Sequence, residues 1–385
     1  MLKEKVNPIE AKKISSYKKC AFHPDSYGYA ENMHMYENIQ NSLNHVNSDL
    51  MRMKIIFHIM AIPTSFDKIR IERRLSDIVT RLNDDFNNYS ENKNTLNAGK
   101  YRSIINNVFL NNMEMQKNYL DEQFTNLMPT VPSEIIFEIS KCYYYKINNK
   151  LDLSKYDDDN DVEIQREIIK KYIHNYDAGA IYPESYINVW IVDFTGSSLM
   201  GFSSFPWEHS NKFNGIVLSR RVIFPEDYAE KSFNQYKTLT HQIGHYFGLM
   251  HTPNKQVKYG AYFSKNVNLD KISRSSINSG KPNIIEHDPT SPRYEWNNEF
   301  PLFMNFMDYT SDNYVCMFTK NQIKIMKSMI NKYYPKLIKE GEELPESKFN
   351  PQTDSFVPTQ KNDLDEIINK KTKGLIFVRR KPIIN

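Results

Sequence analysis

The segment that most constrains this chain is Thr240–His251, which reads THQIGHYFGLMH. His241 and His245 are four residues apart, and on a helix this spacing places both side chains on one face, within reach of a single ion. Gly248 can take the left-handed conformation that ends a helix and redirects the chain, so that His251 returns toward the other two. Three neutral imidazoles leave one tetrahedral position for water, which is typical of a catalytic zinc site.

The segment resembles the metzincin signature HExxHxxGxxH, except that Gln242 occupies the position of the general-base glutamate. The resemblance implies that a glutamate there would take a proton from the zinc-bound water and pass it to the leaving amine. Because an amide cannot accept that proton, we expect zinc and substrate binding to survive while turnover falls by about two to four orders of magnitude. Two histories remain open: a natural pseudo-protease, or a Glu→Gln change made to trap an active enzyme.

A second segment, Asn305–Tyr309, resembles the tight methionine turn of the metzincins. The resemblance implies that Met307 forms an apolar floor under the three histidines. Tyr309 resembles the tyrosine that some members use to hold the zinc or to stabilise the developing oxyanion.

The run Cys316–Thr319 and Gln322, which follow that turn, narrow the resemblance to the pappalysin branch. The resemblance covers about residues 51–335 and implies an α/β fold: a twisted mixed sheet with backing helices, a zinc-site helix and an irregular C-terminal subdomain. Residues 1–50 are predicted to be an N-terminal extension that can act as a pro-segment, and residues 336–385 a polar C-terminal tail. The sequence lacks the cysteines that usually brace the C-terminal part of secreted relatives.

Local patterns predict the individual elements. Runs rich in β-branched and aromatic residues predict strands at 53–60, 134–145, 186–193, 201–206 and 215–219. Helical spacing and capping residues predict helices over 71–86, from Phe233 behind a Ser232/Gln235 capping box, and from Thr319 to about Tyr334. Residues 88–103 are polar and are predicted to form a loop. By resemblance, the segment Gly201–Ser204 is the strand that pairs with extended substrate.

Four further features have a functional and a plainer interpretation. A thiolate at Cys20 can occupy the open zinc position and keep a protease latent, whereas the alternative is an unpaired thiol in a mobile arm. The run Asp157–Asp161 offers hard oxygen ligands to calcium, but it lacks the spacing and the glycine of a dedicated loop, and a solvated acidic loop is the alternative. His58 is expected to pack in the core, and His287 is a ligand by residue type only.

Composition bounds the partners and the location. With 40% apolar and 13% aromatic residues, the 385-residue chain can bury a sizeable core, and its net charge of +4 gives no case for nucleic-acid binding. No run is long enough to span a membrane, and the first residues lack the apolar core of a signal peptide. Three cysteines without paired spacing favour a reducing compartment, so a cytoplasmic or otherwise intracellular location is expected.

Two functions from different classes follow. The first is a zinc metalloendopeptidase that acts on peptide or protein substrates and is impaired by Gln242. The second is a non-catalytic peptide- or protein-binding module on the same scaffold. A third interpretation, zinc as a purely structural clamp, predicts a fourth protein ligand.

Overall fold

The computed structural model describes residues 50–60, 68–87, 98–110, 113–120, 132–147, 150–156, 162–208, 213–225, 233–249, 251, 304–308, 311–338 and 343–346. The predictions for Cys20, Asp157–Asp161, His287 and Tyr309 lie outside these residues, as do those for residues 1–49 and 347–385. They stay predictions.

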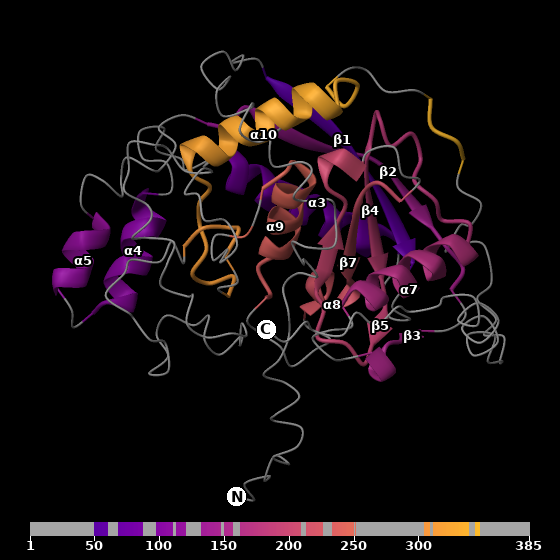
Figure 1. Ribbon diagram of the computed structural model, residues 1–385, viewed down its shortest axis with the longest axis horizontal. Coiled ribbons are helices and arrows are strands. Elements are labelled where there is room, and N and C mark those ends of the chain that lie inside the picture. The colour runs from indigo at the N-terminus through magenta and orange to yellow at the C-terminus, as the bar shows by residue number, and fades with distance from the viewer. Residues whose placement is uncertain are drawn as a thin grey trace, which may run out of the picture.

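Five strands form one mixed sheet in the order β2-β1-β4-β7-β6 (Figure 1). The strands are β1 (Met51–Met60), β2 (Ile135–Tyr144), β4 (Ile187–Val192), β6 (Gly201–Ser203) and β7 (Ile216–Ser219). The first four in the spatial order are mutually parallel, and β6 pairs antiparallel with β7 at one edge. The predicted mixed sheet and its five strands are thus confirmed, except that the strand predicted over 201–206 ends at Ser203 and a 3-10 turn begins at Pro206.

The sheet is buried on both faces, as parallel strands with long apolar runs require. On one face Ile55, Phe57 and Ile59 of β1 join a large core cluster with side chains of α3 (Lys68–Asn87), α9 (Lys237–Tyr246) and α10 (Lys320–Tyr333). On the other face Trp190 and Val192 pack with α7 (Val162–Asn175). Helices therefore cover both faces, and the segment that carries the histidines lies in the first of these two layers.

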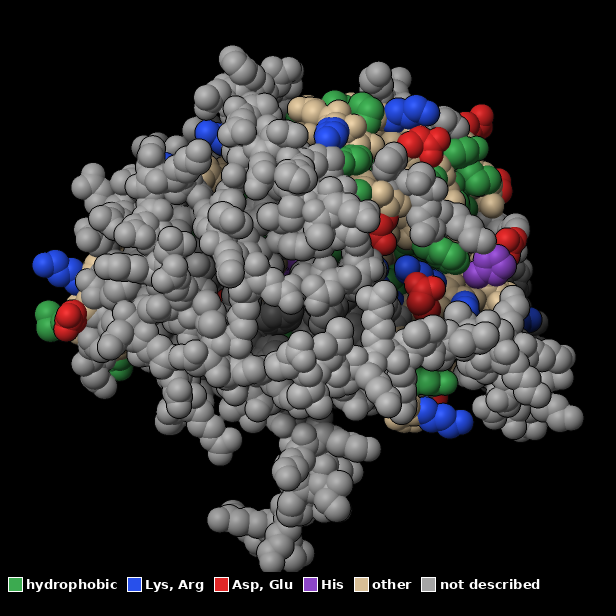
Figure 2. Space-filling view, viewed as in Figure 1, with side chains coloured by type: hydrophobic (Ala, Val, Ile, Leu, Met, Phe, Trp, Pro, Cys, Tyr) green, Lys and Arg blue, Asp and Glu red, His purple; other side chains and the backbone are tan. Residues whose placement is uncertain are grey.

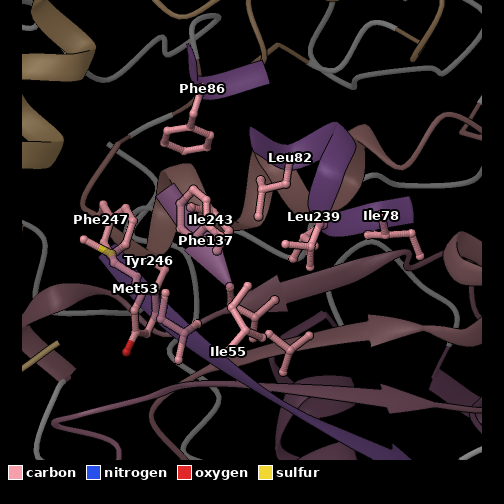
Figure 3. Close-up of a cluster of buried hydrophobic side chains, with 14 of the residues drawn as sticks. Met53, Ile55, Ile78, Leu82, Phe86, Phe137, Leu239, Ile243, Tyr246 and Phe247 are labelled. Carbon is pink, nitrogen blue, oxygen red and sulfur yellow. The ribbon is translucent and has the colours of Figure 1, made fainter. Parts of the chain in front are cut away.

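Helix α3 backs the sheet through the stripe that its sequence predicts. Its buried apolar side chains recur every three or four residues: Ile71, Leu75, Ile78, Val79, Leu82 and Phe86. Figure 3 shows Ile78, Leu82 and Phe86 of α3 on the same side of the sheet as Leu239 and Ile243 of α9. The two helices share one core, so α3 fixes where α9 lies.

The expected core position of His58 is confirmed. Its Nε2 lies 2.8 Å from Asn188 Oδ1, and its Nδ1 lies 2.8 Å from the Tyr145 hydroxyl. Because an amide oxygen only accepts, the ring donates from Nε2 and accepts the tyrosine proton at Nδ1. His58 is therefore neutral and satisfied at the centre of β1.

The remaining elements are short or were not predicted. They are α4 (Ala98–Val108), α5 (Met113–Leu120), α8 (Arg220–Ile223), the 3-10 turns Ser154–Tyr156 and Pro206–Glu208, and a two-stranded parallel pair of β3 (Leu151–Asp152) and β5 (Phe194–Thr195). The prediction of a loop over residues 88–103 is wrong from Ala98 onward, because Tyr101, Ile104 and Ile105 form a buried face of α4.

The visible described surface carries both positive and negative side chains. On the face shown in Figure 2, charged side chains of both signs are interspersed wherever described residues are visible. Among the described helices, none has the length and apolar character needed to cross a bilayer.

Candidate metal centre

Three imidazole nitrogens converge at the end of α9. The Nε2 atoms of His241 and His245 are 3.1 Å apart, and each lies 3.0 Å from Nε2 of His251. All three side chains are buried. Nitrogens held about 2.0–2.1 Å from a tetrahedral zinc would stand about 3.3 Å apart, so the arrangement has the size of a zinc site.

Backbone carbonyls fix the tautomers of His241 and His245. His241 Nδ1 lies 2.7 Å from the carbonyl oxygen of Phe306, and His245 Nδ1 lies 2.7 Å from that of Leu249. A carbonyl can only accept, so both rings carry their proton on Nδ1 and point an Nε2 lone pair at the common centre. Lone pairs that face each other at this distance repel unless a cation lies between them, and borderline-soft zinc suits imidazole nitrogen.

Burial also keeps the ring of His245 in the neutral form that binds a metal. Desolvation lowers the pKa of His245 to about 3; the hydrogen bond to the Leu249 carbonyl opposes this shift, and the positive charge of Arg166 adds to it. The ring is thus unprotonated at neutral pH even before a metal competes for its lone pair.

The start of α9 differs from the prediction. The helix begins at Lys237, not at Phe233, and its N-cap Tyr236 has a left-handed φ of 65° and no side-chain cap. In place of the predicted capping box, the carboxylate of Asp312 accepts hydrogen bonds from the backbone N–H groups of Gln235 (3.0 Å) and Lys237 (3.2 Å). The cap comes from a residue distant in sequence, which local capping patterns cannot reveal.

The end of α9 agrees with the prediction. Gly248 has a φ of 90°, its N–H bonds the carbonyl of His245, and the N–H of Leu249 bonds the carbonyl of Gly244, both at 2.8 Å. This is the Schellman pattern of a helix C-terminus. It turns the chain so that His251 approaches the two histidines of the helix.

Met307 lies directly under α9. A Cβ atom added to Gly244 would be 2.4 Å from Met307 Sδ, so the absence of a side chain at position 244 lets the methionine approach the helix between the two histidines. The resemblance predicts the position of Met307, but the role of Gly244 was not predicted. The signal for it was available, because a glycine inside a helix lowers stability and so requires a packing reason.

The turn that carries Met307 is held by its own first residue. Asn305 Oδ1 accepts the N–H of Met307 at 2.9 Å, and the Asn305 carbonyl accepts the N–H of Asp308 at 3.0 Å. Phe306 lies inside this turn and directs its carbonyl at His241. The turn therefore supplies both the floor and one hydrogen-bond partner of the histidine cluster.

Gln242 is fully buried on α9. It faces the edge strand β6, because a Cβ atom added to Gly201 would lie 3.6 Å from Gln242 Cγ. Strand β6, the predicted substrate strand, thus lies next to Gln242, the residue at the predicted general-base position. Tyr309, predicted beside the metal, lies outside the described residues.

A buried ion pair near the site was also missed. Lys237 Nζ contacts Asp85 Oδ1 of α3, both side chains are at most 8% exposed, and Thr240 donates from Oγ1 to Asp85 Oδ2 at 2.6 Å. Charges this deeply buried must be paired, so the pair pins the first turn of α9 to α3. No local motif marks Asp85, since its partners lie more than 150 residues away.

Fold and site together define an α/β domain with three buried histidines that could hold a metal ion. Residues 170–331 match the peptidase family described as pregnancy-associated plasma protein-A. The chain is 41% identical over 356 residues to an uncharacterized protein of Acanthamoeba polyphaga mimivirus, covering 89% of this chain and 40% of that protein. It is 27% identical over 147 residues to an extracellular metalloprotease of Arthroderma gypseum, covering 37% of this chain and 47% of that protein.

Among solved structures, mature mirolysin of Tannerella forsythia in complex with a cleaved peptide aligns with a TM-score of 0.46 and 16% identity, covering 76% of this chain and 100% of that chain. The chain spans less than half the length of the mimivirus and Arthroderma relatives. The chain is therefore similar to a peptidase family over residues 170–331 and to relatives named metalloproteases, a class of enzyme whose name implies a bound metal.

Proposed function

We propose that this chain has the scaffold of a zinc-dependent metalloendopeptidase of the pappalysin type, whose turnover Gln242 abolishes or strongly reduces. His241, His245 and His251 hold the metal. The observation that carries this proposal is the convergence of their Nε2 atoms to 3.0–3.1 Å while two of the rings give their Nδ1 protons to backbone carbonyls. The family match supports zinc over other metals that imidazole can bind.

The residues around the triad have distinct roles in this proposal. Bound zinc would act as a Lewis acid toward a peptide carbonyl and activate water for its hydrolysis. Gln242 has the position of the general base, but its amide can only hydrogen-bond and cannot take up a proton. Met307, which packs against Gly244, forms an apolar floor beneath the triad. Tyr309 is assigned to the developing oxyanion, as the sequence predicts.

The proposed substrate is a peptide or a protein in extended conformation. Strand β6 is the edge of the sheet and contacts the helix that bears Gln242. Addition of a substrate strand to such an edge would bring a peptide bond toward the triad. The peptidase family match and the relatives named metalloproteases support this class of substrate.

The alternative is a peptide- or protein-binding module without turnover, and Gln242 is the observation that favours it. The amide is fully buried at the position where catalysis needs a carboxylate. A natural protein with this residue would retain the metal centre and the edge strand β6 and use them for binding.

The names of the relatives bear on the expected location. Three cysteines favoured an intracellular protein, but fungal relatives are named extracellular metalloproteases. Their names speak against the intracellular expectation and support a secreted protease in this family.

The test is the substitution Gln242→Glu in the full chain loaded with zinc. Restoring the carboxylate should raise the cleavage rate of unstructured protein and quenched fluorescent peptides by about two to four orders of magnitude over the unaltered chain. A Gln242→Glu, His245→Ala double variant should remain inactive.

A folded Gln242→Glu variant that binds one zinc yet cleaves no faster than the unaltered chain would contradict the disabled-protease proposal. Peptide binding by both forms, measured by fluorescence anisotropy, would then favour the binding module.

A further inference from the structure

A buried pair of side-chain amides joins the start of α10 to the methionine turn. Asn305 Nδ2 donates to Gln322 Oε1 at 2.8 Å, and Gln322 Nε2 donates back to Asn305 Oδ1 at 3.0 Å. Both side chains are at most 2% exposed. The two bonds are reciprocal, so each amide fixes the orientation of the other.

Gln322 is at the same time part of the α10 capping box. Its Oε1 accepts the backbone N–H of Thr319 at 2.8 Å, and its own N–H donates to Thr319 Oγ1 at 3.2 Å. The Gln322 oxygen thus accepts from both the cap and Asn305, whereas the Gln322 nitrogen donates to Asn305. A glutamate would complete the cap equally well. It would place a carboxylate oxygen, in place of the NH2 donor, against Asn305 Oδ1.

From Asn305 the chain of contacts continues into the metal centre. Its Oδ1 also accepts the N–H of Met307 at 2.9 Å, which shapes the turn. The Phe306 carbonyl in that turn accepts the Nδ1 proton of His241 at 2.7 Å, and Met307 packs against Gly244 of α9. A hydrogen-bonded path thus runs from the first turn of α10 to the imidazole of His241.

We propose that Gln322 and Asn305 are positioning residues of the metal centre, which act through the Phe306 carbonyl and Met307. This inference rests on the proposed assignment of His241 as a metal ligand. The amide pair sets the place of the carbonyl that selects the His241 tautomer, and partners of this kind tune a ligand's basicity and direction. The helix cap would accept either residue, whereas the hydrogen bond to Asn305 Oδ1 requires the amide of Gln322.

The test compares Gln322→Glu with Thr319→Ala in the full chain. Gln322→Glu keeps the cap acceptor and loses the donor to Asn305, whereas Thr319→Ala weakens the cap and leaves the amide pair in place. Zinc affinity is measured by competition with a chromophoric chelator, the visible absorption of the cobalt-loaded protein reports ligand geometry, and urea unfolding of the metal-free chain reports stability.

Gln322→Glu should weaken zinc binding by about 10–100-fold and shift the cobalt spectrum. Thr319→Ala should lower the urea midpoint while zinc affinity stays within about twofold. If Gln322→Glu does not fold, Asn305→Ser replaces it, because a serine hydroxyl can still accept the Met307 N–H but cannot reach Gln322.

Unchanged zinc affinity and cobalt spectrum in a folded Gln322→Glu or Asn305→Ser variant would overturn the inference while leaving the metal site standing. Equal weakening by Thr319→Ala would overturn it too, since helix stability alone would then explain the effect. Failure of the unaltered chain to bind zinc would refute both the proposed function and this inference.

Discussion

At the scale of single residues, the histidine cluster depends on two backbone oxygens that no motif contains. The spacing of His241, His245 and His251 predicts that they can meet, and they do. The carbonyls of Phe306 and Leu249 decide that two of the meeting atoms, Nε2 of His241 and Nε2 of His245, are unprotonated nitrogens. The residue pattern thus predicts which side chains converge, whereas tertiary contacts determine which nitrogen of the ring carries the proton.

Gly244→Ala tests the contact beneath the cluster. An added methyl group would meet Met307 Sδ at 2.4 Å, so the methionine must move within a filled core. The expected loss of unfolding free energy is about 1–3 kcal/mol, together with weaker zinc binding. The control is Gly99→Ala in α4, where an added Cβ meets nothing within 4 Å.

The control variant should gain about 0.5–1 kcal/mol from helix propensity. Urea unfolding of both variants measures the two changes in unfolding free energy. A gain in stability for Gly244→Ala similar to that of Gly99→Ala would show that Met307 does not press on the helix.

His58 gives a pH dependence of stability. Burial lowers its pKa to about 4 from an unfolded value near 6.5, with the hydrogen bond to Asn188 opposing the shift. Between pH 6.5 and 4 the His58 ring is protonated in the unfolded state but not in the folded state. The folded state therefore loses stability relative to the unfolded state as the pH falls from 6.5 toward 4. The contribution of His58 to this loss is on the order of 3 kcal/mol.

The measurement is the unfolding free energy of the unaltered chain and of His58→Gln between pH 7 and 4.5. The unaltered chain should lose more stability than the variant over this range. Parallel curves would mean that His58 does not carry the effect.

At the scale of elements, the two helices that build the site are capped in different ways. Helix α10 is capped by its own Thr319 and Gln322, so its start was predictable from four consecutive residues. Helix α9 is capped by Asp312, far along the chain, so its predicted start was wrong. Local signals predict elements only where local residues satisfy the backbone.

Asp312→Ala should therefore destabilise the protein, because it leaves buried N–H groups at the start of α9 without their acceptor. The expected loss is about 1–3 kcal/mol in unfolding free energy. Asn313→Ala, one residue further on, removes only an exposed contact with Gln235 and should change stability by less than about 0.5 kcal/mol.

Asp312→Asn keeps an acceptor oxygen and should lie between these two variants. Equal stability of Asp312→Ala and Asn313→Ala in chemical unfolding would show that the remote carboxylate does not cap the helix.

Two helices, α4 and α7, were not predicted although their sequences carry a helical signal. The loop predicted over 88–103 followed polar composition, although Tyr101, Ile104 and Ile105 already have the spacing of a helical face. Helix α7 has the same signal in Ile169, Tyr172 and Ile173, and it covers the second face of the sheet. These helices were predictable from periodicity.

At the scale of the whole molecule, the site is assembled from parts far apart in sequence. Helix α9 carries His241 and His245, and His251 follows beyond the end of the helix. Helix α3 contributes Asp85, and strand β6 lies beside Gln242. Helix α10 anchors the turn that contains Met307. The strands were predictable from local runs, and the α/β class followed from the family resemblance. The order β2-β1-β4-β7-β6 and the buried contacts between α3 and α9 were not, because long-range packing sets them.

The most direct measurement of the central claim is anomalous diffraction at the zinc edge from crystals of the full chain, combined with metal quantification in solution. The proposal predicts one zinc per chain on the Nε2 atoms of His241, His245 and His251, with solvent as the fourth ligand. An empty cluster in zinc-supplied protein, or a fourth protein side chain on the metal, would contradict it.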